Sequence, residues 1–132
     1  MAKKFVNPTG MKPLGMYTQV TVATGGSIAF ISGQVAVDAA GKVVGEGNIE
    51  AQAVQVFENL KLALGGIGAT FDDVIKFTIY IVGLTQERRK AVMDVRGRYI
   101  NKQNPPAATM VGVECLVQPE LLVEVEAVAV LD

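Results

Sequence analysis

The sequence predicts a single α+β domain, residues 1–132, in which two helices cover one face of a sheet. The chain has 132 residues, which corresponds to one domain at ~150 residues per domain. Two segments show the apolar spacing of helices, and the segments around them show the alternation of strands. The predicted order is strand, strand, helix, strand, helix, strand, strand. Because two helices can cover only one face of such a sheet, we expect a partner subunit on the other face.

The first half of the chain predicts a hairpin followed by a helix. Residues 17–24 and 28–34 are strand-like, and Gly25-Gly26 between them can supply the positive φ angles of a tight turn. Asn48 can cap a helix whose apolar residues recur at three- and four-residue spacing. Gly65-Gly66 end this helix.

The second half predicts a strand, a second helix and two further strands. Residues 74–82 form a strand with a continuous apolar face, and Thr85 can cap a helix that runs to about Ile100. Asn104-Pro105-Pro106 stops this helix. Residues 107–116 and 122–130 are the last two strands.

The last predicted strand has two different faces. Its small apolar side chains at Val123, Val125 and Ala127 suit close packing against helices. Glu124 and Glu126 point to the opposite face, which is expected to meet the partner. Two carboxylates on a partner-facing surface call for a functional or structural explanation.

The composition favours a homo-oligomer. Apolar residues make up 50% of the chain and charged residues only 19%, against ~25% charged residues in an average protein. A domain of this length buries roughly two-thirds of its unfolded surface. We therefore expect apolar area to remain on the outside of a lone subunit, where another subunit would cover it.

The missing residue types narrow the chemistry. The chain has no His and one Cys, Cys115, which excludes Ser-His-Asp and Cys-His pairs and zinc sites built on His or several Cys. We interpret Cys115 as an unreactive core thiol, because no base lies near it in the sequence. The net charge of −1 gives no electrostatic case for nucleic acid or an anionic membrane.

We expect a cytoplasmic location. Lys3 and Lys4 resemble the start of a signal peptide, but Asn7 and Pro8 arrive before any apolar run. No segment offers the ~20 apolar residues that span a bilayer, and a single Cys fits a reducing compartment.

Four stretches resemble the Rid family of reactive intermediate deaminases, also called the YjgF family. They are Met16-Tyr17-Thr18-Gln19, Ile31-Ser32-Gly33-Gln34, the segment from Glu50 to Lys61, and residues 123–130. With Pro106-Ala107 between them, they occur in order and cover roughly residues 12–130. The resemblance implies a chorismate mutase-like α+β fold that assembles as a homotrimer with ligand clefts between subunits.

The resemblance also implies an activity. Rid proteins hydrolyse reactive enamines or imines derived from amino acids to a 2-keto acid and ammonia, with no metal and no cofactor. Glu124 matches the family Glu that positions or activates water, and Tyr17 matches a Tyr that lines the cleft. The backbone at Ser32 and Gly33 matches the donors to the substrate carboxylate.

The chain departs from the family pattern at the position that holds the substrate. Family deaminases carry Pro-Ala-Arg in the strand after the second helix, and that Arg binds the carboxylate in a bidentate fork. Here Ala108 occupies the Arg position, followed by Thr109 and Met110, which we also place in the substrate-binding segment. Losing such a pair costs on the order of a few kcal/mol. Met93 also replaces a common Asn of the second helix, so we expect a less polar pocket and a substrate that can lack a carboxylate.

Alternatives remain open at this stage. The chain can be a degenerate enzyme, or a non-catalytic trimer that holds a small metabolite in the same cleft or docks another protein on its surface. Glu124 can be a strand residue paired with a Lys, Tyr17 can serve packing alone, and Glu126 is better explained by structure than by chemistry. The family also invites an endoribonuclease or translation inhibitor. We disfavour it, because the chain lacks His and its four Arg residues on the second helix form a solvated face by default.

Overall fold

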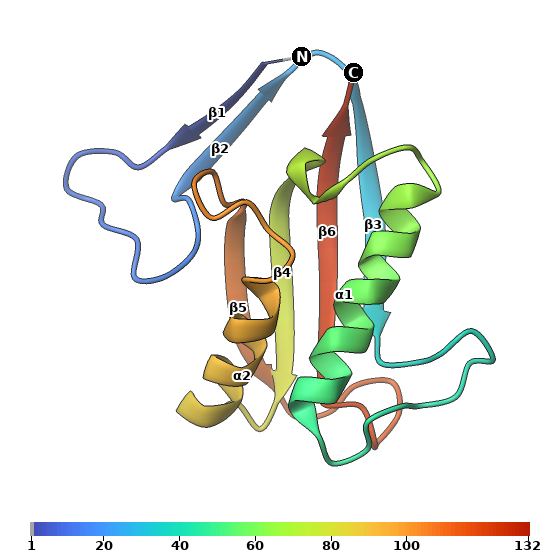
Figure 1. The fold of residues 1–132 in the computed structure, drawn as a ribbon. Helices are drawn as coiled ribbons and strands as arrows, with labels where there is room; N and C mark the ends of the chain where they lie inside the picture. Colours follow the sequence, from blue (N-terminus) through green and yellow to red (C-terminus); the bar gives the residue numbers. More distant parts are fainter. Residues whose placement is uncertain (1) are drawn as a thin grey trace.

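Residues 2–132, which the computed structural model describes, form a four-stranded sheet, two α-helices on one side of it, and a two-stranded arm (Figure 1). The arm consists of β1 (Ala2–Val6) and β2 (Val20–Thr24). The body contains β3 (Ser27–Val35), α1 (Ile49–Gly65), a 3-10 turn (Phe71–Asp73), β4 (Val74–Val82), α2 (Gln86–Arg96), β5 (Ala107–Val113) and β6 (Val123–Leu131). This is the predicted α+β class.

The sheet is mixed, with strand order β3-β6-β4-β5. The last strand in the sequence, β6, lies inside the sheet and pairs antiparallel with β3 and with β4. The edge strand β5 pairs parallel with β4, and α2 provides the crossover between them. The sheet is therefore assembled around β6.

The helix-facing side of the sheet forms the core, as the alternation in the sequence predicts. Phe77, Ile79 and Ile81 of β4 are fully buried beneath the helices. The helix-facing residues of β6 are also buried; they are Val123, Val125, Ala127 and Ala129. On the helix side, α1 contributes Phe57, whose ring stacks on Tyr99 with centroids 5.3 Å apart.

The helix caps account for where the helices begin and end. Asn48 Oδ1 accepts a hydrogen bond from the Ala51 amide at 3.0 Å, and α1 ends at the predicted glycines. Thr85 Oγ1 accepts from the Arg88 amide at 3.1 Å and starts α2. This helix ends at Arg96, with Gly97 as its C-cap, so the prediction that it reaches Ile100 is wrong by four residues.

The predicted hairpin of residues 17–24 and 28–34 is wrong, because β2 pairs with β1 and not with β3. Gly25 and Gly26 do adopt positive φ angles, +76° and +75°, but they turn the chain from the arm into the edge of the main sheet. Thr21 Oγ1 donates to the Ile75 carbonyl at 2.8 Å, and Lys3 Nζ lies 3.3 Å from an Asp73 carboxylate oxygen. These two contacts hold the arm against the start of β4.

Of the last two strands, β5 is shorter than the predicted residues 107–116, and β6 is shifted by about one residue from the predicted residues 122–130. β5 ends at Val113, and the following connection exposes Cys115. The interpretation of Cys115 as a core thiol is therefore wrong, since the strand stops two residues before it. Its neighbour Val117 is exposed as well.

The face of the sheet opposite the helices is uncovered in the single chain. Phe30 of β3 is 81% exposed and Ile28 is 64% exposed. Val111 of β5 is exposed too. We call this surface the open face. Isolated apolar side chains on a surface are common, but several on one sheet face are typical of an interaction surface.

Among residues 2–132, no helix is long and apolar enough to cross a membrane.

A buried amide ties α1 to the start of β6. Gln52 is 0% exposed, its Nε2 donates to the Glu120 carbonyl at 2.9 Å, and its Oε1 accepts from the Leu122 amide at 2.8 Å. A glutamine on the buried face of a helix is uncommon, and both ends of this one are satisfied by backbone.

We expect Gln52→Met to lower the free energy of unfolding by about 1–3 kcal/mol, because it keeps the side-chain size and leaves backbone groups unpaired. Urea denaturation at one fixed protein concentration measures the change. Lys61→Met, on the exposed side of the same helix, is the control and should stay within about 0.5 kcal/mol. Equal losses in the two variants would contradict the role of the amide.

Candidate functional site

A small cavity of about 210 Å³ lies between α2, β5 and the loop that precedes β2. Its lining residues are Leu14, Gly15, Tyr17, Arg89, Met93, Arg96, Ala108 and Met110. Tyr17, Ala108 and Met110 are among the site residues that the sequence predicts, and they come from segments about 90 residues apart in a chain of 132. The fold thus brings three predicted positions to one cavity.

The loop that closes this cavity is held by hydrogen bonds. The Tyr17 hydroxyl accepts from the Leu14 amide at 3.0 Å, which fixes a tight bend over the cavity. Thr18 is buried, and its amide donates to the Pro106 carbonyl at 3.2 Å while its hydroxyl donates to the Pro105 carbonyl. The loop is therefore tied to the residues just before β5.

Arg96 forms the floor of the cavity and is almost completely buried, with 2% of its surface exposed. Its Nη2 donates to the Met16 carbonyl at 2.9 Å, and its Nε has no hydrogen-bond partner among residues 2–132. Burial, with a smaller contribution from the nearby charge of Arg89, lowers the pKa of Arg96 to about 10. The guanidinium remains charged at neutral pH.

The expectation of a solvated arginine face on the second helix is therefore wrong for Arg96. Val92, Val95 and Arg96 are buried together on one side of α2. Arg89, Met93 and Arg96 follow at four- and three-residue spacing, so they share a face of the helix. This spacing was visible in the sequence, where Arg96 stands one turn after Val92. The expected less polar pocket in fact has two arginines in its wall.

Glu124 lies on the open face of the sheet and does not line the cavity. Its side chain covers Gly33, where a Cβ would come within 2.7 Å of the carboxyl carbon, so only glycine permits this approach. The register between β3 and β6 shifts between Ile31 and Gln34, which marks a bulge at this glycine. Burial first, and the charge of Glu126 second, raise the pKa of Glu124 above the usual range of a glutamate.

The remaining predicted residues flank Glu124 or lie further along the sheet. Glu126 accepts a hydrogen bond from the Tyr80 hydroxyl at 2.5 Å, and this bond raises the pKa of Tyr80. Ser32 is exposed beside Gly33, and its carbonyl accepts from Gln34 Nε2 at 3.0 Å. Thr109 turns away from the cavity, and its hydroxyl accepts from Lys76 Nζ at 2.7 Å. Within one chain, the predicted residues therefore do not form one site. Some line the cavity, and the others lie beside Glu124 or further along the sheet.

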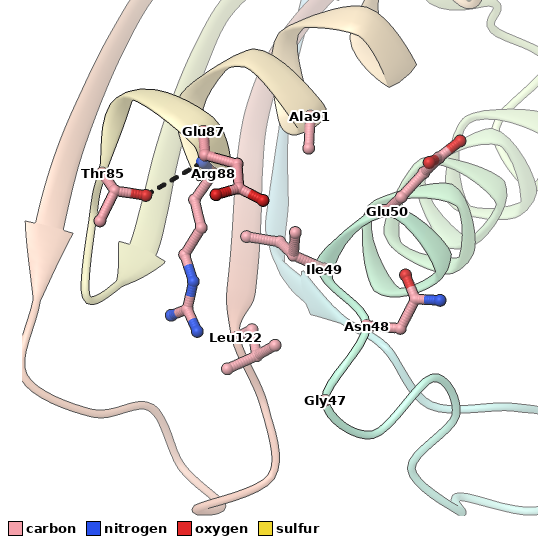
Figure 2. Close-up of a pocket in the computed structure, with 9 residues that line it drawn as sticks. All are labelled: Gly47, Asn48, Ile49, Glu50, Thr85, Glu87, Arg88, Ala91 and Leu122. Carbon is pink, nitrogen blue, oxygen red and sulfur yellow. Dashed lines mark hydrogen bonds between the residues drawn. The ribbon is translucent and has the colours of Figure 1, made fainter.

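A larger cavity of about 600 Å³ opens where the N-terminal ends of α1 and α2 meet (Figure 2). Figure 2 shows Arg88 extending from α2 toward Leu122, and its Nη1 donates to the Val82 carbonyl at 2.5 Å. Glu50 at its rim is paired with Arg98 at 3.1 Å. This cavity contains none of the predicted site residues, and its charged groups already have partners or face solvent. Among residues 2–132, no group of three His, Cys, Asp or Glu side chains could hold a metal ion.

Residues 8–131 match the family described as Endoribonuclease L-PSP. The chain therefore belongs to that family, which includes the Rid proteins. The chain is 36% identical over 131 residues to protein DfrA of Myxococcus xanthus, covering 98% of this chain and 97% of that protein. It is 30% identical over 126 residues to a 2-iminobutanoate/2-iminopropanoate deaminase of Dermatophagoides farinae, covering 95% and 93% of the two chains.

The fold is likewise that of solved Rid proteins. The crystal structure of YyfB, a protein of the conserved Rid family from Yersinia pestis, superimposes with a TM-score of 0.91 at 34% identity. The match covers 99% of this chain and 100% of that one. The family resemblance and the α+β fold that the sequence predicts are both confirmed.

We expect the ionised form of Glu124 to cost stability at neutral pH. Its folded-state pKa is raised, so the folded chain binds this proton more tightly than the unfolded chain does, whose Glu pKa is ~4.3. The wild type and Glu124→Gln should therefore be equally stable at low pH, and the wild type should lose stability relative to the variant as the pH rises through the raised pKa. Urea midpoints of the two proteins at pH 4 and pH 7 measure this difference in stability. A gap between them that does not grow with pH would contradict the prediction.

Proposed function

We propose that this protein binds a small imine, enamine or 2-keto-acid-like metabolite in a cleft between subunits of a homotrimer and hydrolyses the carbon–nitrogen bond. The observation that carries the proposal is the convergence of Tyr17, Ala108 and Met110 on one cavity in a Rid-family fold. The relative named as a 2-iminobutanoate/2-iminopropanoate deaminase supports this reaction class.

The separation of the two residue groups supports a cleft made by two subunits. Glu124 stands on the open face, while Tyr17 and Ala108 line a cavity formed with α2. A neighbouring subunit that covers the open face would bring its own cavity to this Glu124. The exposed Phe30 and Ile28 provide the apolar surface for that contact.

Glu124 has the properties that the hydrolysis needs in a base. Its raised pKa and its position over Gly33 suit a carboxylate that takes a proton from water. The water oxygen then attacks the imine carbon, and the proton passes to the nitrogen. The hydroxyl of the resulting carbinolamine then gives its proton to the nitrogen as the carbon–nitrogen bond breaks. Ammonia leaves and a carbonyl remains, so an imine and one water give a ketone or keto acid and one ammonia.

We expect Glu124→Gln to abolish turnover, because Gln keeps the shape of the side chain but cannot accept the proton. The assay generates 2-aminoacrylate in place and follows the release of pyruvate. Glu114→Gln, an exposed carboxylate on the connection after β5, is the control and should retain full activity. Wild-type rates in Glu124→Gln would remove this residue from the mechanism.

The replacement of the family Arg by Ala108 favours one second candidate, a non-catalytic trimer that binds the same metabolites. In that case the wild-type chain is as slow as buffer, while 2-oxobutanoate still raises its melting temperature. A ligand at ~100 times its Kd stabilises the native state by about 2.7 kcal/mol. Gain of turnover in Ala108→Arg, with an inactive wild type, would support this candidate over the enzyme.

An RNA-cleaving function has less support. Arg96 is buried, and Arg98, which follows the end of α2, is paired with Glu50, so the arginines on and after α2 do not form a continuous basic stripe. The chain contains no His for acid–base cleavage.

We expect light scattering to give about three times the chain mass of 14.0 kDa. Phe30→Asp, on the open face, should shift the mass toward one chain, because it buries a charge in the contact. Leu62→Asp is the matched control, since Leu62 is 74% exposed on α1, within the helix layer. A stable 14.0 kDa wild-type species at micromolar concentration would contradict the trimer.

A further inference from the structure

We propose that Arg96 and Arg89 of α2 form an anion subsite that binds the carboxylate of a small aliphatic 2-oxo acid or its imine. The inference rests on the proposed function and names the residues that replace the missing strand arginine. It reverses the expectation, drawn from Ala108, of a ligand without a carboxylate.

The two arginines face the same cavity. Both line it, together with Met93 between them on the same side of the helix. A Cβ placed on Gly15 would lie 3.7 Å from Arg89 Nη2 and 3.4 Å from the Met93 methyl carbon, so the Arg89 guanidinium lies beneath the loop over the cavity. Arg96 reaches the same loop through its bond to the Met16 carbonyl. Ala108, with its short side chain, leaves the β5 side of the cavity open.

Neither guanidinium is compensated by an acid. Among residues 2–132 the ion pairs involve Lys3, Lys90 and Arg98, and none involves Arg89 or Arg96. Arg96 is 2% exposed and keeps a free Nε donor. A buried cation without an acidic partner is strongly unfavourable, and its like-charged neighbour adds to the cost. A carboxylate in the adjoining cavity would supply the missing acceptor and the missing charge.

The rest of the cavity limits the ligand to a short, mostly apolar molecule. Leu14, Met93, Ala108 and Met110 provide an apolar wall, and the volume of about 210 Å³ suits a ligand of a few heavy atoms. A ligand with a carboxylate at one end and a short alkyl chain at the other would place the carboxylate at the arginines and the alkyl chain against the apolar wall.

The test compares 2-oxobutanoate with butanone, its analogue without the carboxylate, by calorimetric titration and thermal melting of the whole chain. We expect the wild type to bind 2-oxobutanoate and to bind butanone about 10- to 100-fold more weakly. Arg89→Gln and Arg96→Met should each weaken 2-oxobutanoate binding by about 10- to 100-fold. Arg98→Gln, two residues beyond the end of α2 and paired with Glu50 at the surface, should leave the Kd within about twofold.

A second readout separates binding from structure. Arg96→Met removes an uncompensated buried charge, so without ligand its melting temperature should equal or exceed that of the wild type. A structural arginine would instead give a lower melting temperature. If Arg96→Met fails to fold, the structural reading holds for Arg96, and Arg89→Gln, at a half-buried position, decides whether the cavity binds the carboxylate.

The outcomes distinguish this inference from the function on which it rests. Binding of 2-oxobutanoate that is unchanged in Arg89→Gln and Arg96→Met overturns the arginine subsite and leaves the proposed function standing. Equal stabilisation by inorganic phosphate overturns the assignment to a carboxylate. No binding of 2-oxobutanoate or butanone and no turnover of 2-aminoacrylate overturns both.

Discussion

Two helices are too few to cover both faces of a four-stranded sheet, and the properties of this molecule follow from that shortage. The covered face is a conventional apolar core, with Phe77 and Val125 fully buried. The open face instead carries polar and exposed apolar side chains together. Glu124 and Phe30 on that face show both demands at once.

Sequence patterns predicted the elements that depend on local chemistry. The strand at residues 74–82 and the Asn48 cap of α1 are confirmed, since alternation and capping depend on neighbouring residues. The partner of β2 could not be predicted, because β1 reaches it across a loop of residues 7–19 and Gly25-Gly26 permits a corner as readily as a hairpin. Arg96 carried a readable signal in its spacing from Val92, but its burial depends on a loop from the other end of the chain. Of the predicted site residues, Tyr17, Ala108 and Met110 meet in one cavity, while Glu124 points to the opposite face of the sheet, because alternate residues of a strand point to opposite faces.

Two pairs of like charges lie on opposite sides of the sheet. On the open face, Glu124 is partly desolvated and lies near a second carboxylate, Glu126. Beneath the loop, Arg96 is desolvated and lies near a second guanidinium, Arg89. Each pair raises the free energy of its own charged state, and neither is relieved by the other within one subunit. Desolvated groups beside a like charge are typical of functional sites, because a ligand or a neighbouring subunit can supply the opposite charge that the fold lacks.

The position of β6 inside the sheet has a consequence for synthesis on the ribosome. β3 and β4 each pair with β6, so neither can complete its antiparallel contacts until residues 123–131 have left the exit tunnel. At ~5–20 residues per second, the interval between the end of β4 at Val82 and the start of β6 at Val123 lasts roughly 2–8 s. During that time the apolar face of β4 is without its central partner, and unpaired apolar strands are prone to aggregate. A nascent chain of this protein therefore carries an apolar strand without its antiparallel partner until β6 is made.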